Sequence, residues 1–274
     1  MNINGIITRP PRRTTQSSVN FDHDRTIERI EEKYLLTRSE KNALMKAINK
    51  RLKHDTYYKE EVLSLYLDTA NFDLAIKSLD RPNFRTKIRI RAYNIPKRST
   101  KVFFEVKSKL AVGKQKVGNK RRLIIPLKDF YAYLKSGDGL ERTAAIISDG
   151  DPQQIQVAKE LNYLFKIYNL RPQVLIASNR TAFVGKEYPN FRLTFDENLR
   201  FRTTNLKLEK GGNGEKYFPT AQNPKRNIIM EAKTMRAMPP WFVAELSKLK
   251  IYPTRFSKYG KIYQLIKERN QINV

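Results

Sequence analysis

Charged and apolar side chains alternate strictly in the stretch 86–93 of this sequence. On a β-strand, successive residues point to opposite faces, so one face carries Lys87, Arg89 and Arg91 while the other is apolar. Neighbouring cations on one face repel each other. This face therefore either lies in solvent or lines a cavity that holds an anion, and repetition of the pattern in other strands would favour the cavity.

The same alternation recurs along the chain. It predicts further strands at 26–36, 62–68, 101–109, 120–125, 173–184, 191–196, 199–208 and 227–234. Helical spacing predicts helices, caps included, at 37–53, 69–72, 126–135, 151–168, 239–250 and 261–269. Two helix starts carry clear signals, a capping box from Thr37 to Glu40 and Asp151 before Pro152. A hairpin connection is predicted at 114–119.

Carboxylates share the charged faces of three predicted strands. Glu31, Glu105 and Glu231 each lie two residues from a lysine on the same face, a spacing that lets carboxylates hold a metal while cations bind phosphate. An open antiparallel sheet explains each strand separately, with its charges solvated. A closed barrel with a polar lumen and helices over its apolar exterior explains the carboxylates as well. The pattern therefore favours an α+β fold built on an antiparallel barrel.

The charge balance narrows the class of partner. The 274 residues include 54 Lys and Arg against 27 Asp and Glu, a net charge of +27. This excess indicates a polyanionic partner such as nucleic acid, polyphosphate, a nucleotide or an anionic membrane. The absence of cysteine excludes thiolate chemistry, and the two histidines, His23 and His54, lie in polar surroundings that argue against a histidine metal site. No apolar run is long enough to predict a membrane span.

The first 25 residues differ in composition from the rest. Residues 1–25 combine arginines and prolines with a stretch rich in Ser, Thr and Gln, and they lack the apolar core of a secretory signal. We predict a disordered basic tail here, with a transit peptide as the alternative. The hydrophobic fraction of 40% allows a proper core, and 26–270 are predicted to form one domain.

Eight short stretches, spread over 26–266 and in the same order, resemble the polyphosphate polymerase domain of the vacuolar transporter chaperone (VTC) family. They are Glu28-Arg29 with Lys33-Tyr34, 87–91, 104–107, 120–122, 178–183, Arg192 with Asp196, 231–233 and 256–259. This family belongs to the triphosphate tunnel metalloenzymes. The resemblance implies an eight-stranded antiparallel tunnel with a basic lumen, clad by α-helices.

The resemblance also implies a reaction and its residues. The terminal phosphate of ATP would be transferred onto a growing polyphosphate chain, with release of ADP and with Mn²⁺ or Mg²⁺ as cofactor. The family's phosphate-binding cations match Lys33, Arg89, Arg91, Lys107, Lys120, Arg180 and Arg192. Of these, Arg89, Arg91, Arg180 and Arg192 are assigned to the nucleotide phosphates. Glu231 matches the metal-binding carboxylate, and Arg255, where the family more often has lysine, and Lys258 match basic residues near the tunnel end.

Structural roles compete with several of these assignments. Glu31, Glu105 and Lys233 could form ordinary ion pairs inside the lumen, and Asp196 could be a second metal ligand or a salt-bridge partner. Lys87, Lys109 and Arg121 are expected to lie in solvent. One departure is informative: other tunnel enzymes carry a carboxylate two residues before the position of Glu31, and this chain has Arg29 there. The loss of that ligand favours the polymerase branch.

Two rival functions stay open at this stage. One is a triphosphatase on the same fold that acts on inorganic triphosphate or on a nucleoside triphosphate, with water as the acceptor. The other is a polyanion-binding protein without turnover. Specific nucleic-acid binding is not expected, because aromatic residues do not alternate with the cations as stacking platforms would require. Overall we expect a soluble, cytoplasmic, stand-alone enzyme of bacterial type, and the pattern predicts no oligomeric state.

Overall fold

The computed structural model describes residues 29–80, 83–112, 115–219, 223–235 and 237–272. The predicted tail at 1–25 lies outside these residues. The strands are β1 (Arg29–Leu36), β2 (Leu52–Asp68), β3 (Phe84–Tyr93), β4 (Lys101–Val112), β5 (Gln115–Pro126), β6 (Arg171–Gly185), β7 (Arg192–Arg202), β8 (Glu215–Lys216) and β9 (Ile228–Met235). The α-helices are α1 (Arg38–Ile48), α2 (Asp73–Asp80), α3 (Leu127–Ser136), α4 (Leu140–Ile147), α5 (Pro152–Tyr168), α6 (Pro240–Lys248) and α7 (Lys258–Ile272).

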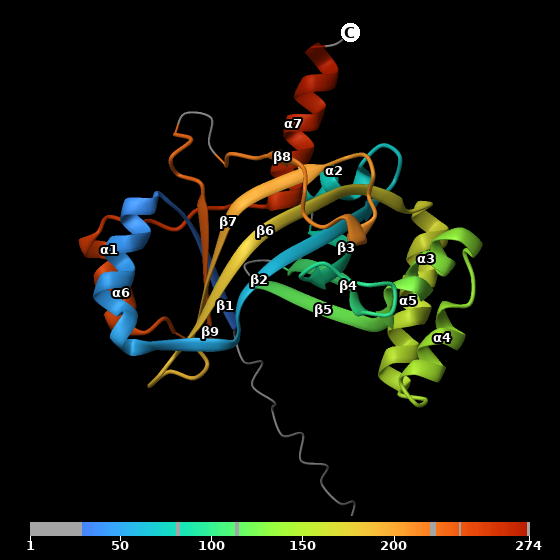
Figure 1. Cartoon of the computed structure of the whole chain (residues 1–274), viewed down its shortest axis with the longest axis horizontal. Coiled ribbons are helices and arrows are strands. Elements are labelled where there is room, and N and C mark those ends of the chain that lie inside the picture. The colour runs from blue at the N-terminus through green and yellow to red at the C-terminus, as the bar shows by residue number, and fades with distance from the viewer. Residues whose placement is uncertain (1–28, 81–82, 113–114, 220–222, 236, 273–274) are drawn as a thin grey trace, which may run out of the picture.

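Eight long strands form one antiparallel sheet in the order β1-β9-β7-β6-β2-β3-β4-β5, and the short β8 pairs with β7. The sheet curls on itself, and helices cover it on several sides, with α1 and α6 at one side and α3, α4 and α5 at the opposite side (Figure 1). The prediction of an α+β fold built on a curled, tunnel-like antiparallel sheet of eight long strands is confirmed. The sheet is not closed into a barrel, because no backbone pairing joins β1 to β5 among the described residues. Across the opening of the curled sheet, Glu31 on the end strand β1 forms an ion pair of 3.8 Å with Lys107 on β4, the neighbour of the other end strand β5.

The apolar faces of the strands pack outward against the helices. Leu63, Ile90 and Phe104 belong to a core that includes Phe130 of α3 and Leu161 of α5. A second core joins Phe195 and Met230 to residues of α1 and α6. Because each fully buried Leu or Phe contributes roughly 1.5–3 kcal/mol, these outer cores stabilise the curled sheet and leave its inner face available for polar groups.

A third core lies on the inner face of the sheet, at one end. Tyr66 of β2 is stacked on Tyr259 of α7 at a ring distance of 4.3 Å, and Val174 and Ile229 pack with the same helix. Alternation places Tyr66 on the side of the sheet that carries Arg89, its partner in the register of β2 and β3. Helix α7 therefore fills one end of the interior and leaves the remainder polar.

Several element boundaries differ from the predicted ones. The helix expected at 69–72 begins at Asp73, because the Asp68 carboxylate and the Thr69 hydroxyl accept hydrogen bonds from the first backbone N–H groups of α2. The strands expected at 191–196 and 199–208 form one strand, β7, which ends at Arg202. Asn198, in a left-handed conformation (φ 52°), lies at a register irregularity between β7 and β6, and this bulge interrupts the alternation without ending the strand.

The pattern also understated three elements. Strand β2 begins at Leu52, ten residues before the predicted start, and an irregularity between His54 and Lys59 masks its alternation. Strand β5 already begins at Gln115, inside the predicted hairpin connection. Helix α7 begins at Lys258 rather than at 261, because the Ser257 hydroxyl accepts a hydrogen bond from the Gly260 N–H.

The sequence pattern did not predict helix α4. The short helix α4 had no capping signal, since Gly139 precedes it without a side-chain cap. Among the described helices, none is long and apolar enough to cross a membrane.

Asp68 connects β2 to both α2 and α7. Its fully buried carboxylate accepts hydrogen bonds from the backbone N–H groups of Thr69, Leu74 and Ala75 at 2.8–2.9 Å, and from the Tyr259 hydroxyl at 2.7 Å. Burial, with the Asp68 carboxylate beside it, raises the pKa of Tyr259, so the phenol stays protonated and donates.

We expect the Asp68→Ala variant to lose at least about 3 kcal/mol of unfolding free energy, because several buried donors lose their acceptor at once. Denaturant titration followed by circular dichroism measures this loss. The matched control is Asp80→Ala, which removes an exposed carboxylate at the end of α2 and should change the unfolding free energy by less than about 0.5 kcal/mol. Equal effects of the two substitutions would contradict a structural role for Asp68.

Candidate functional site

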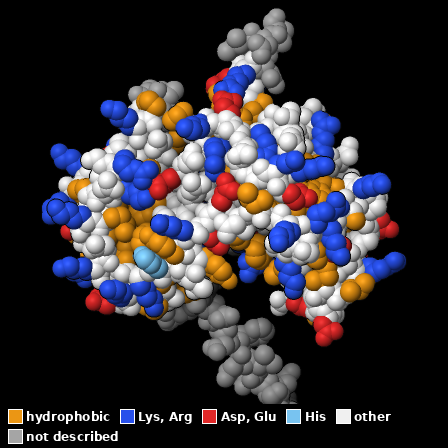
Figure 2. Space-filling view, in the orientation of Figure 1, with side chains coloured by type: hydrophobic (Ala, Val, Ile, Leu, Met, Phe, Trp, Pro, Cys, Tyr) orange, Lys and Arg blue, Asp and Glu red, His pale blue; other side chains and the backbone are white. Residues whose placement is uncertain are grey.

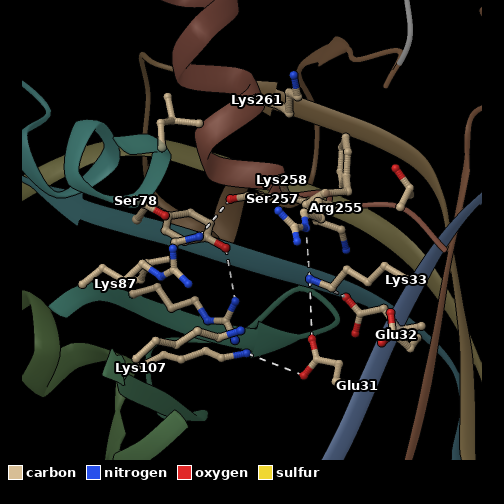
Figure 3. Close-up of a pocket in the computed structure, with 18 of the residues that line it drawn as sticks. Glu31, Glu32, Lys33, Ser78, Lys87, Lys107, Arg255, Ser257, Lys258 and Lys261 are labelled. Atoms are coloured by element: carbon tan, nitrogen blue, oxygen red, sulfur yellow. Dashed lines mark hydrogen bonds and ion pairs between the residues drawn. The ribbon is translucent and has the colours of Figure 1, made fainter. Parts of the chain in front are cut away.

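The interior left open by α7 is a strongly basic cavity of about 750 Å³. Twelve of its lining residues are Lys or Arg, and three are Glu. They come from strands on both sides of the curled sheet and from the start of α7 (Figure 3). The cations are Lys33, Arg85, Lys87, Arg89, Arg91, Lys107, Lys109, Arg180, Lys233, Arg255, Lys258 and Lys261. Such a surplus of enclosed positive charge favours an anion with several charges.

Strands β1 and β9 build one wall by pairing lysines with glutamates. The Lys33 ammonium lies 3.5 Å from Glu31 and 3.6 Å from Glu231, and it also donates to the Phe256 carbonyl. Glu231 lies 3.0 Å from Lys233 as well. Burial alone would raise the pKa of Glu231, but Lys233, Lys33 and Lys258 outweigh it and hold the pKa well below its usual range. Glu231 is therefore ionised at neutral pH and is a poor proton acceptor.

The opposite wall is organised around Glu105, whose side chain is 2% exposed. The Arg89 guanidinium donates to this carboxylate at 2.7–2.8 Å, and the Lys120 ammonium pairs with its other oxygen at 2.7 Å. Arg89 also donates to the Tyr66 hydroxyl at 3.2 Å. Burial alone would raise the pKa of Glu105, but Arg89, Arg91 and Lys120 lower it to about 2. Glu105 thus orients Arg89 and neutralises part of this wall.

Asp196 forms the third buried anchor. Arg180 donates to both of its carboxylate oxygens at 2.7 Å, and Lys258, at the start of α7, pairs with one of them. The carboxylate is fully buried; burial would raise its pKa, but the two cations hold it well below the usual range. Asp196 is therefore a salt-bridge partner that positions Arg180 and Lys258.

Three cations on β3, Arg85, Lys87 and Arg91, have no carboxylate in hydrogen-bond contact among the described residues. Arg91 donates to the Ser64 hydroxyl at 3.4 Å, and Lys87 donates to the Ser257 hydroxyl at 2.8 Å. Burial lowers the pKa of Lys87 to about 8, although the Tyr66 phenol opposes this shift. Burial likewise lowers the pKa of Lys107 to about 8, against the influence of Glu31. Arg91, Lys87 and Lys107 are therefore the most direct candidates for contact with a bound anion.

Eight of the ten site residues proposed from the sequence line this cavity: Lys33, Arg89, Arg91, Lys107, Arg180, Glu231, Arg255 and Lys258. Lys120 is not among the lining residues; its ammonium group pairs with Glu105. Arg192 is 48% exposed and pairs with Asp55 at 2.7 Å, because the irregular part of β2 brings that carboxylate beside it. Their proposed roles in phosphate contact stay predictions.

The expectation that Lys87, Lys109 and Arg121 lie in solvent was wrong for two of them and incomplete for the third. Lys87 is partly buried in the cavity wall, since α7 folds back over it. Arg121 pairs with Glu160 of α5. Lys109 is exposed but lies at the cavity rim.

Sequence reasoning missed Tyr66 and Ser257. The alternation of 62–68 did place Tyr66 opposite the leucines, and this was the available signal. Burial would raise the pKa of Tyr66, but Arg89, Lys87 and Arg91 lower it to about 8.

The donor set fits a divalent metal that arrives with its phosphate ligand. Among the described residues, no group of three or more Asp, Glu, His or Cys side chains could hold a metal. Mg²⁺ and related hard cations commonly use one or two carboxylates and take their other ligands from substrate phosphates and water. Glu231, with Glu31 on the far side of Lys33, supplies such carboxylates.

One protein-family model matches most of the chain. The sequence profile described as "VTC domain" matches residues 28–267. No curated protein matches the sequence. The solved structure of the PH1819 protein from Pyrococcus horikoshii shows 9% identity and a TM-score of 0.43, over 86% of this chain and 99% of that one. A putative adenylate cyclase from Vibrio parahaemolyticus shows 10% identity and a TM-score of 0.40, over 84% and 94%. Structural similarity at this level carries no inference about chemistry.

We expect inorganic triphosphate to bind more weakly as the pH rises through 8. Lys87 and Lys107 are charged below their pKa of about 8 and neutral above it, and ionisation of Tyr66 near the same pH acts in the same direction. A bound anion favours the protonated lysines, so binding at about pH 8.5 should take up protons. Calorimetry in buffers of different ionisation enthalpy measures this uptake.

The Lys87→Arg variant should take up fewer protons, because arginine stays charged throughout this range. Comparison with the wild type removes the titration of the ligand itself. The matched control is Lys128→Arg, on the exposed face of α3. Identical proton uptake in all three proteins would contradict the assignment of Lys87 to the binding wall.

Proposed function

The chain belongs to the VTC domain family, and from this membership we propose that it is an ATP-dependent polyphosphate polymerase. In this proposal the γ-phosphate of ATP passes to the end of an inorganic polyphosphate chain in the basic cavity, and ADP is released. ATP and polyphosphate are then its substrates.

The observation that carries the proposal is the length of the cationic row. From Arg85 to Arg91, four cations on one face of β3 line the cavity, a span of about 20 Å at the usual rise per residue. Lys107 and Lys109 run beside them on β4. A single triphosphate is shorter than this row. The extra cations suit a chain of phosphates that extends beyond the reacting group.

The chemistry of the lining supports phosphate rather than water as the acceptor. A polyphosphate end is already an anion at neutral pH and needs no general base, whereas water must lose a proton. The described lining residues include no histidine, and although burial alone would raise the pKa values of Glu31 and Glu231, the surrounding lysines lower them. Lys87, Lys107 and Tyr66, with pKa values of about 8, are mostly protonated at pH 7. Catalysis would then rest on positioning and on charge neutralisation.

Each anchored cation has a defined part in this proposal. Arg89, held by Glu105, and Arg180, held by Asp196, present pre-oriented guanidinium groups to the nucleotide phosphates. Lys33 pairs with both Glu31 and Glu231, and its charge offsets the repulsion between the two carboxylates. When bound at Glu231, Mn²⁺ or Mg²⁺ would supply additional neutralisation of the phosphate oxygens.

The test is incubation of the purified protein with ATP and Mn²⁺, with ADP and free phosphate measured separately and the products resolved on a gel stained for polyphosphate. We expect ADP without matching free phosphate, together with a polyphosphate ladder. Glu231→Ala should reduce ADP release at least about 100-fold, because it removes the proposed metal ligand and leaves Lys33 and Lys233 with less compensation. Chelation of the metal should have a similar effect.

The matched control is Glu215→Ala, a surface carboxylate paired with Arg269, which should retain full activity. Equal amounts of ADP and free phosphate without a ladder would identify a triphosphatase instead. If neither ATP nor triphosphate is turned over with any divalent metal, the protein is a polyanion-binding protein.

A further inference from the structure

Two aromatic rings lie at the end of the interior opposite α7. Tyr93, the last residue of β3, and Phe103, near the start of β4, meet at a ring distance of 5.7 Å with their planes at 76°. The Arg122 guanidinium lies 5.0 Å from the centre of the Phe103 ring. Tyr93 and Phe103 are only partly buried, and Arg122 is exposed. Both rings therefore keep solvent-exposed surface, beyond the residues that line the cavity, and Arg122 lies over one face of Phe103.

The rings lie on the polar, inner face of the sheet. Tyr93 follows Arg91 by two residues, and Phe103 precedes Glu105 by two, so alternation directs each ring to the same side as those charged groups. Inward aromatic residues of this kind are not required by the outer cores, in which neither Tyr93 nor Phe103 takes part. The neighbouring Phe104, by contrast, is fully buried against α3 and α5.

The rings adjoin the cations assigned to the nucleotide. Phe103 is the register partner of Arg91 on the adjacent strand, and Tyr93 lies about 7 Å further along β3. The Tyr93 phenol is close enough to act electrostatically on both Arg91 and Arg180. A ribose can bridge this separation between a phosphate and a base.

The other end of the cavity has a different chemistry. Its rim carries Arg85, Lys109 and Lys261 beside α2 and α7. The aromatic residues among the cavity lining, Tyr66 and Phe256, are both buried. Cations can hold phosphates at either end, but accessible ring faces for a base lie at the Tyr93 end.

We propose that Tyr93, Phe103 and Arg122 form the binding site for the aromatic base of the nucleoside triphosphate. The nucleotide would enter at this end, with its base stacked on the rings and its phosphates directed to Arg91 and Arg180. This inference rests on the proposed function, since it assumes that a nucleotide is the phosphate donor. Stacking of one base on an aromatic side chain changes affinity about 5- to 150-fold, and arginine adds a cation–π contribution.

The test compares two ligands in binding experiments without turnover. Dissociation constants for β,γ-methylene ATP and for inorganic triphosphate are measured by calorimetry for the wild type, Tyr93→Leu and Phe103→Leu. We expect each substitution to weaken the nucleotide about 10-fold and to change triphosphate binding less than about twofold. Phe103→Trp, which keeps a ring face, should retain nucleotide affinity.

The matched control lies on the same strand. Phe84, at the opposite end of β3 and 56% exposed, points to the other face of the sheet, and Phe84→Leu should change neither constant. If a leucine variant does not fold, Arg122→Gln on the exposed surface should still weaken the nucleotide about threefold and spare triphosphate.

Two results would overturn the inference in distinguishable ways. If the wild type binds both ligands but the substitutions affect both equally, or neither, the base does not bind at this end while the proposed function stands. If the wild type binds neither ligand, the proposed function fails and this inference fails with it.

Discussion

Enclosed positive charge is the constraint on which this structure depends. Strands on both sides of the curled sheet direct lysines and arginines into one cavity, where they repel each other and lose contact with water. The fold compensates with a few buried carboxylates, each of which serves two cations: Glu105 holds Arg89 and Lys120, and Asp196 holds Arg180 and Lys258. Both carboxylates are paired well enough that burial does not protonate them. The charge that they leave uncompensated is what a polyanion can neutralise.

The same charge explains how the sheet is held together. Strands β1 and β5 end the hydrogen-bonded path, and the ion pair from Glu31 to Lys107 connects the two sides of the cavity without a backbone ladder. Around this polar interior, the outer cores against α1, α3, α5 and α6 supply the apolar burial that the charged face cannot. The space-filling view shows Lys and Arg side chains spread over the whole visible face (Figure 2), so the charge excess is shared between interior and exterior.

Helix α7 makes the interior asymmetric. Its apolar residues fill one end of the lumen through the stack of Tyr259 on Tyr66, while Lys258 at its start enters the cavity and pairs with Asp196. Asp68 fixes the helix by accepting the Tyr259 hydroxyl. Helix α7 thus supplies apolar packing at one end of the interior and a cation, Lys258, inside the cavity. The rings of Tyr93 and Phe103 lie at the opposite end, so the two ends of the interior differ in chemistry.

Local pattern was sufficient for much of this. Alternation has a period of two residues, and a capping box spans only three, so the strand at 86–93, the shared face of Lys87, Arg89 and Arg91, and the start of α1 at Thr37 followed from neighbouring residues alone. That Lys87 lies in a cavity wall and not in solvent did not follow from them. The net charge of +27 likewise required only counting, and it indicated a polyanionic partner. The tertiary structure decided what depends on residues far apart in the chain. It pairs Arg192 with Asp55 and brings Lys87 into a hydrogen bond with Ser257, which lies 170 residues away in the chain. It also pairs Asp196 with both Arg180 and Lys258. Local pattern leaves these pairings open because the partners lie on different elements, and only the strand register, the curl of the sheet and the return of α7 determine which of them meet.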